Sequence, residues 1–237
     1  MRHADDPYGS GSSAGGPAPA MKGATVREFL LWYEKQRGTN YHQGLQRRLA
    51  GSPADLVWFD RPALGLVGTD WYPVELIHAV LDTLAEECPN DMHKLIAEAS
   101  EAAVAKLTRG IYQYLFRMVA SPKLYARHIQ RAWNLLHTTG TRKIVITSAG
   151  LADSTIEHWP GHHRWLCVVT TETMRATFHA MGARNVVVER VGCVSTGAPL
   201  CRALVRWDDR ARFPGGICDG SALPCRSAIG WMSSIAW

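Results

Sequence analysis

Two cysteines flank a turn in the stretch CVSTGAPLCRALVRW, residues 193–207. Thiol pairs bind soft metal ions, carry redox chemistry or form disulfides. Because Cys193 and Cys201 would face each other across the base of a β-hairpin, all of these roles fit the spacing. The alternation of the second strand places Cys201 on one face with Ala203, Val205 and Trp207, which favours another interpretation, that of small, buried core cysteines.

A second group of metal-ligating residue types lies in EHWPGHHRWLC, which contains His158, His162, His163 and Cys167. Imidazole and thiolate groups suit zinc or another transition metal. Structural zinc sites usually take ligand pairs from two separate knuckles, whereas this stretch reads as one irregular segment. We therefore expect a solvated loop with aromatic packing here, and metal binding is the alternative.

His78 shares a helical face with Val74, Ile77 and Leu81. A histidine on an apolar face can be an axial haem ligand, but more often it bonds a backbone carbonyl at the edge of a core. We expect the second role for His78, which leaves no residue assigned to haem. The sequence has no Gly-x-Ser-x-Gly elbow, no phosphate-binding Gly-rich loop and no His-Glu-x-x-His motif, so an enzyme is not favoured and no catalytic residue is predicted.

Composition limits the class of protein further. At 237 residues the chain can bury the core of a single domain. The formal net charge is +5, but Lys and Arg alternate with acids along the sequence, which does not favour nucleic acid as a partner. No apolar run reaches the length of a membrane span, and the first residues lack the apolar core of a signal peptide. We expect a cytoplasmic protein without membrane contact and with reduced thiols.

Hydrophobic periodicity predicts a helical first half and a mixed second half. The Gly-, Ser- and Pro-rich residues 1–20 are expected to be a disordered tail and residues 213–237 an irregular tail, which leaves one domain over residues 21–212. Apolar spacing and caps predict helices over residues 24–38, 73–89, 91–107, 111–120, 121–140 and 170–182. Alternation predicts strands over residues 142–150, 185–193 and 200–207, with residues 154–169 as an irregular segment.

These elements indicate an α/β (α+β) fold, in which a helical N-terminal half packs on an antiparallel sheet with a C-terminal β-hairpin. Three motifs occur together within it: Ser121-Pro122, Trp133 with Gly140, and Cys193 with Gly197, Cys201 and Trp207. With them, residues 21–208 resemble a paralogous family of myxobacteria that is related to the superfamily of 4-vinyl reductase, haem-NO-binding and TRAPP vesicle-tethering domains. The resemblance implies helices on an antiparallel sheet around a hydrophobic pocket, used as a sensory input and often dimeric.

The resemblance also implies candidate site residues. The pocket would be lined by aromatic and small side chains, for which the candidates are Tyr112, Tyr114, Phe116, Trp133, Phe178 and Cys201. Cysteines of the 4-vinyl reductase relatives have been suggested as metal ligands, and Cys193 and Cys201 match the hairpin positions. Haem-NO-binding members clamp haem with a Tyr-x-Ser-x-Arg motif, whereas the nearest match here, YARHIQR, has Tyr125 and Arg127 but no Ser in register. The cofactor is left open: a small hydrophobic ligand is favoured over metal or haem.

We predict a non-catalytic sensory or regulatory domain that binds a small apolar molecule and signals to a partner that the sequence does not identify, with a homodimer implied by the resemblance. One alternative is a ligand-free dimerisation or partner-tethering protein of the same fold. A second alternative is an enzyme accessory that acts on a tetrapyrrole or aromatic substrate with a metal at Cys193 and Cys201.

Overall fold

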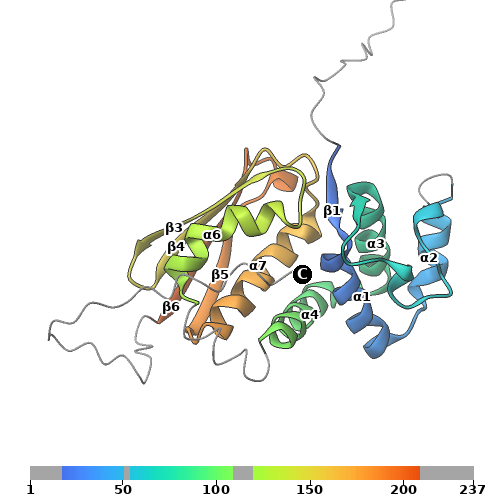
Figure 1. The fold of residues 1–237 in the computed structure, drawn as a ribbon, viewed down its shortest axis with the longest axis horizontal. Helices are drawn as coiled ribbons and strands as arrows, with labels where there is room; N and C mark the ends of the chain where they lie inside the picture. The colour runs from blue at the N-terminus through green and yellow to red at the C-terminus, as the bar shows by residue number, and fades with distance from the viewer. Residues whose placement is uncertain (1–17, 51–53, 109–119, 209–237) are drawn as a thin grey trace, which may run out of the picture.

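The computed structural model describes residues 18–50, 54–108 and 120–208. Within these ranges the protein has two halves that pack side by side (Figure 1). A group of helices forms one half, and a four-stranded antiparallel sheet with two helices forms the other, so the predicted fold class is confirmed. None of the helices in these ranges is long and apolar enough to span a membrane. The predicted helix 111–120, with Tyr112, Tyr114 and Phe116, lies outside the described residues, as do residues 1–17 and 209–237.

The helical half follows from apolar stripes at helical spacing. Its helices are α1 (Gly23–Arg37), α2 (Tyr41–Arg48), α3 (Val74–Glu87) and α4 (Met92–Leu107). A short antiparallel ribbon of β1 (Ala20–Lys22) and β2 (Trp71–Pro73) joins the start of α1 to the start of α3. Two short 3-10 helices, η1 (Ala54–Leu56) and η2 (Pro62–Gly65), lie between α2 and β2.

The sheet half consists of β3 (Thr141–Ser148), β4 (Leu151–Glu157), β5 (Arg184–Gly192) and β6 (Cys201–Asp208), in the spatial order β3-β4-β6-β5. Helices α6 (Pro122–Asn134) and α7 (Arg164–Ala180) lie on the same face of the sheet (Figure 1). Residues facing these helices are buried, for example Ile144, Ala152 and Val205. The opposite face carries ion pairs such as Arg202 with Asp153. Helix α4 packs along α7, and this contact joins the two halves.

Two secondary-structure boundaries around the stretch EHWPGHHRWLC were predicted wrongly. Helix α7 begins at Arg164 and not at Thr170 or Thr171, because His163 caps it: the His163 Nδ1 accepts the Trp165 backbone N–H at 3.3 Å. Histidine is not among the usual N-cap residues, so the sequence pattern did not indicate a helix start at Arg164. The first residues of the expected irregular segment, 154–157, belong to the strand β4, whereas residues 158–163 form a loop. The inward positions of β4 include Ala152 and Ser154, which give weak apolar alternation.

Other differences are smaller. Helix α2 was not predicted, since YHQGLQRR buries only Tyr41 and Leu45. Helix α6 ends at Asn134, before the predicted stop at Gly140. Residues just before Met21 also take part in the fold: the Pro19 carbonyl accepts the Val74 N–H at 3.2 Å, and β1 starts at Ala20.

A strained turn inside the helical half is held by one half-buried carboxylate, that of Glu34. Ala63 (φ 50°) and Leu64 (φ 58°) are consecutive residues in the left-handed region, and both are fully buried. Such a conformation costs non-glycine residues free energy, so neighbouring contacts must hold it. The Ala63 N–H donates to the carboxylate of Glu34 at 3.0 and 2.9 Å, and the Tyr41 hydroxyl donates to the same carboxylate at 2.7 Å.

We therefore predict that Glu34→Ala lowers the free energy of unfolding by about 2 to 3 kcal/mol, because two buried donors lose their acceptor. Urea denaturation measures the change. Glu98→Ala is the control, since Glu98 only forms an exposed pair with Lys94, and it should change the value by less than about 0.5 kcal/mol. Equal effects of the two substitutions would show that the Glu34 carboxylate does not hold the turn.

Candidate metal centre

Three separate segments bring four metal-ligating side chains together. His162 lies in the loop before α7, Cys167 in the first turn of α7, Cys193 after β5, and Cys201 at the first residue of β6. Their ligand atoms all lie within 4.8 Å of one another. The three cysteines are buried and His162 is half-buried, so this His–Cys₃ cluster lies just beneath the surface.

The distances within the His–Cys₃ cluster are short. The Cys167 Sγ lies 3.1 Å from the Cys201 Sγ and 3.4 Å from the Cys193 Sγ. The His162 Nε2 lies 3.4 Å from both the Cys167 and the Cys193 sulfur atoms. All three cysteines are free thiols and not disulfides. The disulfide alternative between Cys193 and Cys201 is therefore not what the structure contains.

The local fold explains this convergence. The Gly197 residue in the connection between β5 and β6 has φ 86°, and this left-handed turn lets the chain reverse after η3 (Val194–Thr196). Cys193 precedes η3, while Cys201 pairs with Ile156 in the ladder of β4 and β6. Both cysteines thus lie at the end of the sheet where the first turn of α7 begins.

Hydrogen bonds among the thiols change their acidity. The hydrogen bond from Cys167, opposed by burial, lowers the pKa of Cys201 to about 4. Cys167, the donor of that bond, has a raised pKa because its hydrogen bond to Cys201 and its burial favour the neutral thiol. The hydrogen bond with Cys201 likewise raises the pKa of His162. The cluster therefore holds at least one thiolate next to an imidazole, which is the charge state from which metal binding starts.

The donor set fits zinc. Three thiolates and one imidazole are a common structural zinc set, with Zn–S bonds of about 2.3 Å and tetrahedral geometry. Tetrahedral bonds of that length place sulfur atoms about 3.8 Å apart. The observed sulfur separations of 3.1 and 3.4 Å are slightly smaller, so the side chains need to move apart by only a few tenths of an ångström.

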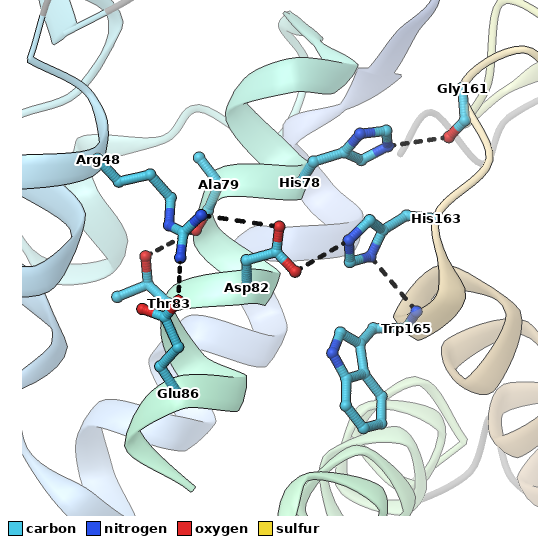
Figure 2. Close-up of polar contacts among 9 residues, drawn as sticks. All are labelled: Arg48, His78, Ala79, Asp82, Thr83, Glu86, Gly161, His163 and Trp165. Atoms are coloured by element: carbon cyan, nitrogen blue, oxygen red, sulfur yellow. Dashed lines mark hydrogen bonds and ion pairs between the residues drawn. The ribbon is translucent and has the colours of Figure 1, made fainter. Parts of the chain in front are cut away.

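The loop that carries His162 is bound to α3 on both sides of this residue (Figure 2). The His78 Nε2 lies 3.1 Å from the Gly161 carbonyl oxygen, and the His163 Nε2 lies 3.1 Å from Asp82. The two imidazole rings stack with centroids 4.7 Å apart. Since the His163 Nδ1 accepts the α7 cap bond, its Nε2 carries the proton and donates to Asp82. His78, Asp82, Gly161 and His163 form a latch between the helical half and the cluster.

The latch extends to α2. Arg48 lies 3.9 Å from Asp82 and also pairs with Glu86, so the carboxylate that accepts from His163 is itself positioned from α2 (Figure 2). Burial lowers the pKa of His163, which keeps this residue in the neutral form that caps α7. The role expected for His78, a boundary histidine bonded to a carbonyl, is confirmed by its contact with Gly161.

The structure thus brings Cys193 and Cys201 together, as their spacing suggested, and adds His162 and Cys167 to them. His158 and His163 take other roles: His158 is exposed, and His163 belongs to the latch. The site was not predicted because EHWPGHHRWLC and CVSTGAPLC were considered separately. Each stretch supplies one pair of ligands, His162 with Cys167 and Cys193 with Cys201, and two such pairs are what a structural zinc site needs.

Three of the candidate pocket residues, Trp133, Phe178 and Cys201, lie within the described ranges, and the two cavities found there do not bring these three together. Trp133 stacks on His137 at 3.7 Å between ring centroids, and Phe178 packs against Tyr125 and Trp207. Cys201 borders a small cavity of about 20 Å³ between α7 and the sheet. A larger open cavity of about 670 Å³ lies at the other end of the sheet, where Ile146, Met181 and Trp207 contribute apolar walls. Neither cavity is bordered by Trp133 or Phe178.

Comparison with solved structures identifies the fold. An H-NOX protein mutant from S. oneidensis in the Fe(II) ligation state superposes with a TM-score of 0.57 at 13% identity, covering 79% of this chain and 96% of that one. The Fe(II) unliganded H-NOX protein from K. algicida gives a TM-score of 0.56 at 14% identity, covering 81% of this chain and 100% of that one. At this identity the likeness shows the fold alone.

No protein-family model matches the chain. No curated protein matches it either. The likeness to H-NOX structures confirms the predicted fold, whereas the resemblance to a myxobacterial family finds no support among these comparisons.

The residues that the structure describes do not fit a haem at His78. The His78 Nε2 is engaged with the Gly161 carbonyl, and the ring is stacked on His163, so neither the atom nor the space for an axial ligand is free. Tyr125 packs on Phe178, while Arg127 is exposed, so these two residues do not converge as a propionate clamp.

We predict that His163→Ala lowers the free energy of unfolding by about 1 to 2 kcal/mol, since α7 loses its cap and Asp82 loses its donor. Urea denaturation at equal metal content measures the change. His179→Ala, at the exposed end of the same helix, is the matched control and should change the value by less than about 0.5 kcal/mol. If both variants unfold at the same urea concentration as the unaltered protein, the latch does not stabilise the fold.

Proposed function

We propose that this chain is a non-catalytic regulatory domain of H-NOX-like fold in which the His–Cys₃ cluster binds Zn²⁺ and reports its occupancy to the helical half. The observation that carries the proposal is the position of His162. It belongs to the cluster, while its two neighbours, Gly161 and His163, bond to α3. A change at the cluster therefore acts on the contact between the two halves.

The closed donor set argues for a regulatory or structural role and not for catalysis. Catalytic zinc sites have three protein ligands and leave one position open to water or substrate, whereas four protein ligands complete the tetrahedron. Here four side chains converge, and the three cysteines are at most 7% exposed. The alternative of a metal-dependent enzyme accessory is less well supported by this arrangement.

The latch supplies a path from the cluster to α3. When His162 is held with the cysteines, the loop places the Gly161 carbonyl against His78 and the His163 ring against Asp82. Without a metal, His162 is held to the cysteines only by hydrogen bonds at 3.4 Å, which restrain the loop less than a metal–nitrogen bond would. The two halves then lose part of their connection, and this difference between the two states is what a partner could recognise.

A second candidate function, binding of a small hydrophobic molecule, is supported by the larger cavity. Its volume of about 670 Å³ lies within the range of about 300 to 1,000 Å³ that ligand pockets occupy. Apolar Ile146, Met181 and Trp207 line it together with polar Ser121 and Lys123. A panel of apolar compounds that never protects Trp207 fluorescence from an aqueous quencher would speak against this function.

We predict that the full chain binds one Zn²⁺ and that Cys201→Ala and His162→Ala each weaken binding by at least about a hundredfold. Native mass spectrometry gives the stoichiometry, and competition with a chromophoric chelator gives the affinity. Cys88→Ala is the control, because Cys88 lies near Tyr33 and away from the cluster, so its affinity should equal that of the unaltered chain.

Metal removal provides the test of regulation. We expect chelation to speed amide hydrogen exchange in residues 158–165 and at the facing turn of α3, while the core of β3 and β4 keeps its protection. Loss of metal without any change in exchange at α3 would leave a metal site but would contradict its regulatory role.

A further inference from the structure

Arg142 is a buried charge that forms no ion pair with any residue in the described ranges. This residue of β3 is 8% exposed, and it is the single permanently charged side chain among the buried residues of the described ranges. Its guanidinium contacts the Met174 sulfur at 3.9 Å and lies over the Trp133 ring at 5.4 Å, while its Nε finds no hydrogen-bond partner within the part of the chain that the structure describes. An unpaired buried charge is costly, so this position calls for a nearby negative group.

The sheet register places Arg142 and the cluster on one row. Arg142 pairs with Ile156 of β4, and Ile156 pairs with Cys201 of β6. Directly opposed residues of antiparallel strands point to the same face, so all three side chains project beneath α7. Arg142, Cys167 and Cys201 border the same cavity of about 20 Å³, which is room for little more than a water molecule.

The charges of the two groups are complementary. A divalent ion with three thiolates and one neutral imidazole carries one net negative charge, and Arg142 supplies one positive charge. The Arg142 charge acts on a neighbouring buried group: burial, reinforced by this charge, lowers the pKa of His137 to about 3. His137 thus stays neutral and does not compete as a second cation.

We propose that Arg142 is the buried counter-charge of the metal–thiolate centre and that it raises the affinity for a divalent ion held by three thiolates. This inference rests on the proposed metal centre. Arg142 acts as a positioning and charge-balancing residue through the cavity that it shares with Cys167 and Cys201, and it is not a ligand. A metal centre with less negative charge would gain less affinity from the Arg142 charge.

The test compares Zn²⁺ affinity, by chelator competition, in variants of the full chain. Arg142→Met should weaken binding by about tenfold or more, which is the usual scale for groups that support metal ligands, and Arg142→Lys should keep most of the affinity. The control is Arg190→Met, since Arg190 borders the same cavity but is exposed and screened by solvent. It should change the affinity by less than about threefold.

Two further measurements separate charge from packing. In a Cys193→His background the centre becomes neutral, and Arg142→Met should then change Zn²⁺ affinity by less than about twofold. The metal-free Arg142→Met chain should melt no lower than the unaltered metal-free chain, because it no longer buries an unpaired charge. If Arg142→Met fails to fold, Arg142→Gln replaces it in the same comparison.

Failure of the two proposals is distinguishable. If the unaltered chain binds no Zn²⁺, the metal centre itself is wrong. If it binds Zn²⁺ and the neutral variants of Arg142 bind equally well, or lose the same affinity in the Cys193→His background, the metal centre stands and the counter-charge proposal is overturned.

Discussion

The close packing of three cysteine sulfurs behind the first turn of α7 is the constraint on which the rest of the structure depends. Sulfur atoms 3.1 and 3.4 Å apart can share one proton or one metal ion, but three ionised thiols without a cation would repel one another. The neighbouring groups fit this requirement: His162 completes a tetrahedral donor set, and Arg142 places a positive charge in the same buried row.

The connection between the halves follows from where His162 lies in the chain. The residues before and after it hold to α3 through His78 and Asp82, and the helix after it begins with the His163 cap. The loop therefore makes three kinds of contact within a few residues: with the cluster, with the N-terminus of α7 and with α3. Because one backbone segment makes all three, a shift of the loop at one contact also moves the residues that make the other two.

Much of the fold could be predicted from sequence periodicity. The helices α1, α3 and α4 and the strands of the β5–β6 hairpin have apolar spacing that the structure confirms within a few residues. The start of α7 and the strand β4 were lost because their defining residues are unusual: a histidine cap, and Ala152 and Ser154 at inward strand positions. Cys193 and Cys201 could be singled out by spacing, but joining them to His162 and Cys167 required the fold. Arg142 shares the strand face of Ile144 by alternation, but its charge and its place near the start of the strand do not indicate burial, which only the fold shows.

The central claim, that four side chains from three segments form one zinc site, is tested most directly by X-ray absorption at the zinc edge on the protein purified without chelators. We expect three sulfur atoms at about 2.3 Å and one nitrogen atom at about 2.0 Å around the zinc ion, with this signal lost when the metal is removed. A shell of oxygen and nitrogen atoms without sulfur, or protein that contains no zinc after growth with ample metal, would contradict it.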